Sequence, residues 1–368
     1  MKYYIIAGEA SGDLHAANLI REIRKKDPES VVRAWGGDMM EEAGAEIVKH
    51  YRDLAFMGFV EVVANLRTIL RNIRFCKEDI QAFKPDAVIL VDYPGFNLRI
   101  AEFVKGLGIK VFYYISPQVW AWKKSRVKKI KRDVDQMYVI LPFEKEFYER
   151  YDYEVEFVGH PLLDAIERRK KERVHEKVSS DSDKNDERKL IAILPGSRKQ
   201  EISVMLPVML SMVKEFSDHR FVVAAAPSVE QEFYEDLIGD LPVDVWSGRT
   251  YEILESAHAA MVTSGTATLE TALFRVPEVV CYKGNAVSYQ IAKRLVDVGF
   301  ISLVNLVMEE EVVKELIQSD FNTKNLRKEL DLIVNDDSYR EKMMMNYRAL
   351  AEKLGGEGAS ARVAQHML

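Results

Sequence analysis

The sequence predicts two α/β domains, each built on a doubly wound parallel sheet. Three observations support this fold class. Short β-rich runs alternate with helical periods through most of the 368 residues. The run "AVILV" at 87–91 is apolar throughout, as in a strand that helices cover on both faces. The alternation stops at 168–188 and then resumes, and two successive series imply two domains.

The first domain is expected at residues 1–167. Its predicted strands are 3–7, 31–35, 87–91, 110–115, 137–140 and 155–158. Helical spacing separates these strands. In the stretch 13–25, for example, one helical face carries Ala16, Leu19, Ile20 and Ile23.

Residues 168–188 contain almost no apolar side chains and are interpreted as a solvated linker or the poorly ordered edge of a domain. The second domain is expected at 189–336. Its predicted strands are 190–194, 221–226, 243–246, 259–263 and 278–282. Helical stretches are predicted near 309–318, 323–334 and 337–353. The last helices, about 337–368, are expected either to fold back on the first domain or to swap with a second chain.

Composition excludes several classes of protein. Hydrophobic residues make up 48% and charged residues 30%, which is typical of a soluble globular protein. A net charge of −6 disfavours nucleic acid as a partner. There is no apolar run of 18 residues, and the N-terminus lacks a signal-peptide pattern. The two cysteines form no CxxC, which indicates a reducing compartment and no structural zinc.

Three strand-to-helix turns carry glycine and hydroxyl residues: "AGEASGD" (7–13), "LPGSR" (194–198) and "TSGTA" (263–267). Such turns present free N–H groups and a helix dipole to an anion, typically phosphate. Arg198 would add a bidentate clamp. The alternative for any one turn is simple helix capping. Two such turns in the second half favour a nucleotide diphosphate, bound in a cleft between the domains. The P-loop and GxGxxG motifs are both absent.

Two acids and a histidine are candidates for chemistry at these strand ends. Asp92 ends the 87–91 strand, where partial burial would raise its pKa toward the range of a general base. The alternative is that Asp92 only organises its turn, with Asn97 capping the next helix. Glu270 either accepts ribose hydroxyls or is an acid favoured in a first helical turn. A second candidate base is His160, although a lone histidine is more often structural.

A basic and apolar edge is predicted from two segments. In 123–132, seven of ten residues are Lys or Arg, and the apolar stripe of Val127, Ile130 and Val134 leaves these cations on the outer faces. Trp120 and Trp122 precede them. The candidate lipid contacts are Val62, Val63, Leu66, Ile69, Leu70, Lys124, Lys128 and Lys131. The edge suits an anionic membrane or a lipid substrate. The alternatives are a core-facing helix at 59–75 and a solvated face at 123–132.

Seven motifs follow one another along the chain: "GEASGD" (8–13), "MGFVEV" (57–62), "SPQVWAW" (116–122), "LPFEKEFY" (141–148), "VGHP" (158–161), "LPGSR" (194–198) and "SGTATLE" (264–270). Their order and content closely resemble the lipid-A-disaccharide synthases, which are inverting glycosyltransferases of the GT-B type. The resemblance runs from residue 3 to about residue 317.

The resemblance implies a reaction. The family joins UDP-2,3-diacylglucosamine to 2,3-diacylglucosamine 1-phosphate (lipid X), forms a β-1,6-linked disaccharide 1-phosphate and releases UDP. It implies peripheral action at the cytoplasmic face of the inner membrane of a Gram-negative bacterium, with no metal and no cofactor. The sequence leaves open whether the protein is a monomer or a homodimer.

The resemblance also implies roles for single residues. Asp92 matches the family's catalytic Asp, which would deprotonate the acceptor 6-hydroxyl. The positions implied on the donor side are Arg198, Ser264, Gly265, Thr266, Glu270 and Asn305. The opening loop, with Glu9, Ser11 and Gly12, is expected to border the sugar or the acceptor.

Two positions depart from the pattern of relatives. Gly95 stands where some relatives carry a second acid, and Val304 stands where many have proline before the Asn. A metal-dependent GT-A enzyme would need an Asp-x-Asp pair, but "DVD" (133–135) and "DSD" (181–183) lie at a helix end and in the linker. A UDP-sugar epimerase could share the same fold, and a non-enzymatic protein could bind anionic lipid through the basic edge.

Overall fold

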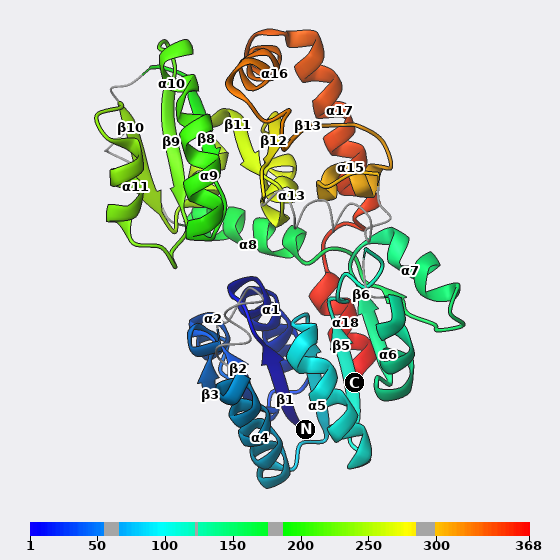
Figure 1. The fold of residues 1–368 in the computed structure, drawn as a ribbon. Coiled ribbons are helices and arrows are strands. Elements are labelled where there is room, and N and C mark those ends of the chain that lie inside the picture. The colour runs from blue at the N-terminus through cyan, green and yellow to red at the C-terminus, as the bar shows by residue number, and fades with distance from the viewer. Residues whose placement is uncertain (55–65, 122–123, 176–186, 285–298) are drawn as a thin grey trace. The chain divides into compact units, whose positions relative to one another are not determined.

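The structure is a computed structural model that describes residues 1–54, 66–121, 124–175, 187–284 and 299–368. The chain divides into two units. The first comprises Met1–Lys177 together with Leu354–Leu368, and the second comprises Val178–Lys353. Figure 1 shows each unit as strands flanked by helices.

The first unit is built on a parallel sheet with the strand order β3-β2-β1-β4-β5-β6-β7. Its strands are β1 (Lys2–Ala7), β2 (Val31–Gly36), β3 (Glu46–His50), β4 (Ala87–Val91), β5 (Lys110–Tyr114), β6 (Gln136–Val139) and β7 (Glu156–Phe157). All five residues of β4 are buried, as the apolar run predicted. The half-buried strand β3 is absent from the sequence prediction, because its short run of mixed polar and apolar residues gives no strong signal.

Helices flank this sheet in two groups. One group consists of α1 (Ala10–Lys26), α2 (Asp38–Glu42), α8 (Leu162–His175) and α18 (Ala359–Met367), in which α1 packs on the other three. The other consists of α4 (Leu66–Phe83), α5 (Pro94–Gly106) and α6 (Val127–Asp133), in which α5 packs on its two neighbours. The remaining elements are η1 (Tyr51–Leu54), η2 (Lys124–Arg126) and α7 (Pro142–Glu149).

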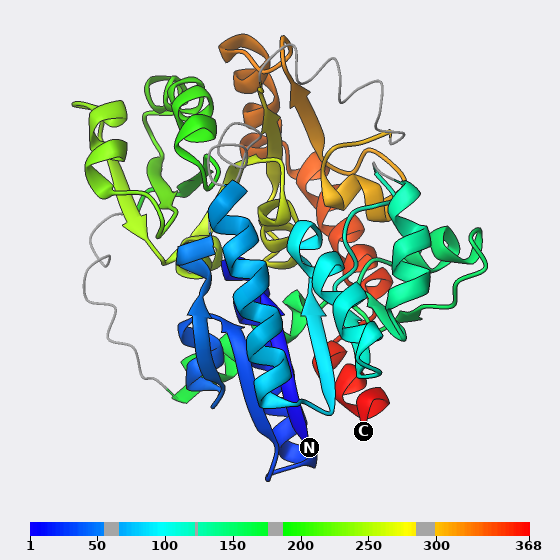
Figure 2. The same cartoon turned by 60° about the horizontal axis from the view of Figure 1, so that its bottom comes forward.

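The C-terminal helix α18 belongs to the first unit. Asp164 of α8 accepts the backbone N–H of Gly358 (2.6 Å) and of Ser360 (2.9 Å), and so caps the start of α18. Figures 1 and 2 both show α18, in red, beside the cyan strand β5.

The second unit is built on a parallel sheet with the order β10-β9-β8-β11-β12-β13. Its strands are β8 (Leu190–Leu194), β9 (Arg220–Ala225), β10 (Val243–Ser247), β11 (Ala257–Thr263), β12 (Glu278–Tyr282) and β13 (Lys314–Ile317). Its helices are α9 (Lys199–Leu210), α10 (Met212–Glu215), α11 (Gln231–Ile238), α12 (Thr250–Ser256), α13 (Thr266–Leu273), α15 (Leu303–Met308), α16 (Thr323–Asn335) and α17 (Asp337–Lys353).

Three sequence predictions about elements are wrong. Residues 314–317 of the helix predicted near 309–318 form strand β13, because pairing with β12 outweighs the helix propensity of Lys, Glu and Leu. Residues 168–175 of the predicted linker continue helix α8, and the rest of the linker up to 186 lies outside the described residues. Helix α17 belongs to the second unit, where it packs on α15 and α16, and only α18 joins the first.

Candidate active site

Two turns lie side by side at the carboxyl edge of the first sheet. Strands β1 and β4 are parallel neighbours, and Ala7 pairs with Val91 at their ends. The chain that leaves β1 forms the 8–13 loop, and the chain that leaves β4 forms the turn at Asp92. The topology therefore brings the opening motif and the candidate base to one place, as expected for ligand sites in doubly wound sheets.

Asp92 stands in an unusual backbone conformation. Its φ is 42° and that of Tyr93 is 48°, so two consecutive non-glycine residues are left-handed. Such strain persists only where the surroundings impose it, and it clusters at functional sites. Here Asp92 donates its N–H to the carbonyl of Tyr114 (3.2 Å). The Asp92 carbonyl accepts from the Tyr113 hydroxyl (2.5 Å) and the Asn97 amide (2.8 Å).

Asn97 does not cap a helix, as the sequence had suggested. It lies inside α5 and is fully buried. Its Nδ2 donates to the carbonyl groups of Val91 (3.2 Å) and Asp92. Tyr113 supports the same turn through its hydroxyl group. The sequence did not predict this role, because a tyrosine within an apolar strand does not reveal which group its hydroxyl will bond.

The carboxyl group of Asp92 titrates near neutrality. Burial and, after it, the negative charge of Glu9 raise the pKa of Asp92 to about 7, while the N–H of Tyr93 acts in the opposite direction. A carboxylate with this pKa is well matched to accept a proton from a hydroxyl at neutral pH.

The opening loop is packed closely against this turn. A Cβ on Gly8 would lie 2.4 Å from Cγ of Tyr93, so the tyrosine ring occupies the space of a side chain. A Cβ on Gly12 would lie 3.2 Å from Cβ of Ala7. The absence of a side chain at Gly12 therefore allows helix α1 to lie close to β1. Glu9 is half-buried and Ser11 is exposed.

Asp13, the last residue of the opening motif, has an internal structural role. It is buried and accepts the N–H groups of Gly37 (2.7 Å), Met39 (3.2 Å) and Met40 (3.2 Å). These bonds tie the start of α1 to the turn between β2 and α2. Of the two acids in the loop, Asp13 therefore has a structural role. The negative charge of the other, Glu9, acts on Asp92.

His160 is not suited to act as a base. Its ring Nδ1 accepts the N–H of Leu162 (3.2 Å), and its backbone N–H donates to the carbonyl of Leu354 (2.9 Å). Burial lowers the pKa of His160 to about 3, with the nearby His15 as a second cause. The structure therefore supports the structural interpretation of this histidine.

Two further turns lie at the carboxyl edge of the second sheet, after the parallel neighbours β8 and β11. In the first, Gly196 has φ 109°, which favours glycine. Arg198 follows as the N-cap of α9, with its side chain 57% exposed and paired to Glu201 at 3.0 Å. Because Arg198 is exposed, an anionic ligand has access to its guanidinium.

The turn after β11 has an open glycine. Gly265 has φ 157° and ψ −164°, a region almost restricted to glycine, and apart from its chain neighbours no described residue has an atom within 4 Å of the place a Cβ would take. Thr266 begins helix α13 and is exposed. Thr266 and Ala267 are the first two residues of the helix, so no helical turn precedes them to supply acceptors for their N–H groups. These N–H groups are therefore available to an anion.

Ser264 is engaged inside the protein. Its N–H donates to the carbonyl of Cys281 (3.1 Å), and its hydroxyl donates to the carbonyl of Ile301 (2.9 Å). While these bonds hold, neither donor of Ser264 is available to a ligand. This differs from the sequence-based expectation that its hydroxyl and amide would face UDP.

Glu270 lies one turn into α13. It is half-buried, and its Oε1 accepts from the hydroxyl of Tyr251 (3.3 Å). Burial raises the pKa of Glu270, and the hydrogen bond from Tyr251 acts against that shift. The second carboxylate oxygen gives this residue capacity for a further hydrogen bond.

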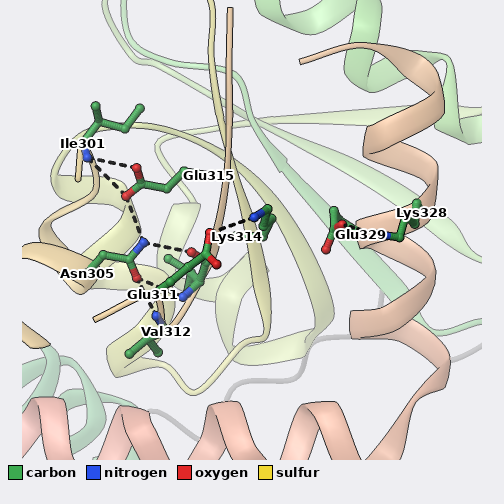
Figure 3. A network of polar contacts seen from close by, with 9 residues as sticks. Ile301, Asn305, Glu311, Val312, Lys314, Glu315, Lys328 and Glu329 are labelled. Atoms are coloured by element: carbon green, nitrogen blue, oxygen red, sulfur yellow. Dashed lines mark hydrogen bonds and ion pairs between the residues drawn. The ribbon is translucent and has the colours of Figure 1, made fainter. Parts of the chain in front are cut away.

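Asn305 is fully buried, and its side chain is saturated by the protein (Figure 3). Its Nδ2 donates to the carbonyl of Val313 (2.8 Å) and to Oε1 of Glu315 (2.9 Å). Its Oδ1 accepts the N–H groups of Val312 (2.8 Å) and Val313 (3.0 Å). An Asn side chain offers two donors and two lone pairs, so none is left for a ligand. In this structure Asn305 therefore does not offer the contact with the donor that was expected. Its side chain instead supports the backbone at 312–313 and the carboxylate of Glu315.

The basic and apolar edge falls only in part within the described residues. Val62, Val63 and Trp122 lie outside them, and Leu66 begins α4. Among the described side chains of α4, the exposed apolar ones are Leu70 (54%) and Phe75 (42%), beside the half-buried Ile69 and the exposed Arg67, Arg71 and Arg74. These side chains form an apolar and basic surface on α4.

The stripe of Val127 and Ile130 on α6, with Val134 directly after the helix, is buried, as predicted. Lys128 and Lys131 are exposed, as is Lys124 in η2. Trp120 is buried and packs edge-on against Phe143, with ring centroids 4.9 Å apart. It is therefore a core residue and not part of the exposed surface of this edge.

The acids of "DVD" are used within the first unit. Asp133 is buried and paired with Arg132 (2.6 Å), and Asp135 accepts the N–H of Val111 (2.9 Å). Within the described ranges, no group of three or more His, Cys, Asp or Glu side chains is arranged to hold a metal ion. Among the described helices, none is long and apolar enough to span a membrane.

Known proteins resemble this chain in sequence and in fold. The family model for lipid-A-disaccharide synthetase matches residues 3–366. A lipid-A-disaccharide synthase of Geobacter sulfurreducens is 40% identical over 366 residues, which cover 98% of this chain and 94% of that protein.

Among solved structures, UDP-GlcNAc 2-epimerase from Neisseria meningitidis bound to UDP-GlcNAc superposes with a TM-score of 0.72 at 15% identity, over 100% of this chain and 99% of that chain. The glycotransferase of kitacinnamycin superposes with a TM-score of 0.64 at 15% identity, over 100% and 98%. The likeness confirms the predicted fold class of two Rossmann-like α/β domains of GT-B type.

Proposed function

This chain belongs to the lipid-A-disaccharide synthase family and is a glycosyltransferase of lipid A biosynthesis, and we propose that it uses UDP-2,3-diacylglucosamine and lipid X as its substrates. The products are then a β-1,6-linked tetraacyl disaccharide 1-phosphate and UDP. Support for the proposal comes from the match over residues 3–366 and from the chemistry that each sheet edge carries.

The observation that carries the mechanism is Asp92, a carboxyl group with a pKa of about 7 on a strained turn at a sheet edge. In the proposed single displacement, its carboxylate takes the proton of the acceptor 6-hydroxyl. The oxygen attacks C1 of the donor sugar, and the bond from C1 to the UDP oxygen breaks with the electron pair leaving on UDP. The configuration at C1 inverts, and no metal takes part in the proposed step.

The donor-side groups lie on the second unit. The N–H groups of Thr266 and Ala267, at the positive end of α13, suit the diphosphate. Arg198 would neutralise the charge that develops on UDP as it leaves. The free acceptor capacity of Glu270 suits a ribose hydroxyl. Gly265 leaves room for close approach of the ligand to the backbone.

The surface on α4 and the cations of α6 suit two acylated, anionic substrates. Leu70 and Phe75 would enter the interfacial region of a bilayer, and the neighbouring cations would contact anionic head groups. The proposed location is therefore peripheral, at the cytoplasmic face of the inner membrane.

The test supplies purified protein with UDP-2,3-diacylglucosamine and lipid X in detergent and EDTA, and follows the disaccharide 1-phosphate by mass spectrometry. Asp92→Asn is compared with the native protein and with Asp86→Asn. Asp86 makes a matched control because it lies at the opposite, amino end of β4, where it accepts the N–H of Lys2. UDP binding is measured calorimetrically for all three.

We expect product from the native protein and from Asp86→Asn, and a rate reduced about 100-fold or more in Asp92→Asn with UDP affinity retained. Full activity of Asp92→Asn would remove Asp92 as the base. No product from any of them would reject these substrates. Conversion of the UDP-sugar without lipid X would indicate an epimerase.

A further inference from the structure

We propose that Glu315 is a positioning residue for the donor turn, acting on Ser264 through the backbone of Ile301 and Ser302. This inference rests on the proposed function, because it takes the turn at 264–266 as the binding site for UDP. Glu315 lies on β13, an edge strand that the sequence did not predict.

The carboxylate of Glu315 accepts N–H groups from Ile301, Ser302 and Asn305, and Figure 3 shows its contacts with Ile301 and Asn305. Its Oε2 accepts the N–H of Ile301 at 3.0 Å, and its Oε1 accepts the N–H of Ser302 at 2.9 Å. Oε1 also accepts from Nδ2 of Asn305 at 2.9 Å. Hydrogen bonds to an ionised carboxylate are stronger than those between neutral groups, so residues 301–302 are held firmly on β13.

The other end of the Ile301 residue reaches the donor turn. While its N–H bonds to Glu315, its carbonyl accepts the hydroxyl proton of Ser264 at 2.9 Å. The backbone of residues 301–302 therefore links Glu315 to Ser264, with hydrogen bonds to Glu315 at its N–H groups and to Ser264 at the Ile301 carbonyl. The next residue, Gly265, has backbone freedom that only glycine offers, so its conformation depends on how firmly its neighbour Ser264 is held. The N–H of Ser264, bonded to Cys281, provides a second anchor on β12.

Asn305 completes this support. It bonds to the carboxylate of Glu315 and to the backbone at 312–313, so it fixes the Glu315 side chain and the start of β13 together. Asn305 therefore supports the donor turn through Glu315, since its own side chain has no hydrogen-bonding group left for a ligand.

The experiment measures the dissociation constant of UDP by calorimetry for the native protein, Glu315→Gln, Ser264→Ala and the double variant. The matched control is Glu311→Gln, because Glu311 is exposed nearby and its side chain pairs with Lys314. Circular dichroism melting reports the folding of each variant. Steady-state assays separate the KM for the UDP-sugar from kcat.

Loss of one carboxylate oxygen should weaken UDP binding and raise the KM for the UDP-sugar by about tenfold, with a smaller change in kcat. The double variant should bind UDP no more weakly than the weaker single variant, because both substitutions break one path. Glu311→Gln should bind UDP as the native protein does.

Several outcomes would overturn the inference. Unchanged UDP affinity in Glu315→Gln, with or without a lower melting temperature, would reduce Glu315 to a structural residue. Independent, multiplicative losses in the double variant would do the same. If Glu315→Gln fails to fold, unchanged affinity in Ser264→Ala decides against the path. No UDP binding by the native protein would overturn the proposed function, and this inference with it.

Discussion

The ring of Tyr93 occupies the space that a side chain on Gly8 would need, with Cγ 2.4 Å from the place of a Cβ. This contact joins the opening loop after β1 to the strained turn after β4, on which Asp92 stands. Glu9 follows Gly8 directly, so the contact also sets where the charge of Glu9 lies relative to Asp92. Gly8 of the opening motif is therefore required by the packing between the two turns.

Gly8→Ala should displace Tyr93 and disturb the Asp92 turn. We expect a loss of roughly 1–3 kcal/mol in the free energy of unfolding, because the added methyl overpacks a closed contact. The transferase rate should fall more than tenfold through misplacement of the base. Urea denaturation and the disaccharide assay measure the two effects.

Gly95→Ala is the matched control for that substitution. Gly95 lies in the first turn of α5, and no described atom is within 4 Å of the position of its Cβ. Stability should stay constant or rise slightly, since alanine is a better helix former than glycine. Equal losses of unfolding free energy and of transferase rate in Gly8→Ala and Gly95→Ala would contradict the prediction that the close packing at Gly8 causes the effect.

The pH dependence of the reaction should report Asp92. A general base must be ionised, so kcat/KM should fall as the pH drops through about 7, the pKa of Asp92. The negative charge of Glu9 is one cause of that raised pKa. Glu9→Gln removes the charge, so the acidic limb of the kcat/KM profile should move to lower pH.

The exposed Glu29 gives a control at a distance from the turn, and Glu29→Gln should leave the profile in place. An acidic limb that stays near pH 7 in Glu9→Gln would mean that burial alone sets the pKa of Asp92. A profile without a limb between pH 5 and 8 would contradict its assignment as the base.

Asp164 should hold the C-terminal helix on the first unit. Asp164→Ala removes the acceptors of the Gly358 and Ser360 N–H groups, and we expect a loss of about 1–2 kcal/mol in unfolding free energy. Urea titration followed by circular dichroism measures it. Glu167→Ala on the same helix removes an ion pair with Lys170 and should cost less than about 0.5 kcal/mol.

The α4 surface should bind vesicles. The double substitution of Leu70→Ser and Phe75→Ser should lower the partition coefficient on vesicles containing phosphatidylglycerol by about fivefold or more, because less apolar area enters the interface. Added salt should weaken the binding of the native protein, since its cations are screened. Co-sedimentation measures both.

Val204 on α9 is the control for this surface, because it is an apolar side chain that is 40% exposed on the second unit. Val204→Ser should leave vesicle binding unchanged. Equal weakening by both changes would indicate nonspecific adsorption of the protein in place of docking through α4.

Much of the fold could be predicted from the sequence, because strands and turns leave a pattern within a few consecutive residues. A buried parallel strand needs a continuous apolar run, and β4 and β8 show one directly. The strand-to-helix turns are equally local, since glycine with a capping residue marks them wherever they occur. Asp92 was a candidate for the same reason, because it follows an apolar strand immediately.

Only the tertiary structure decided the remaining features, because they depend on partners distant along the chain. Strand β13 exists through its pairing with β12, although its residues favour a helix. Asn305 is saturated by residues 312–315, and Trp120 is buried against Phe143. Helix α18 joins the first unit through Asp164, across almost two hundred residues. Composition and spacing describe what a residue can do, whereas long-range contacts determine which of its groups remain free to do it.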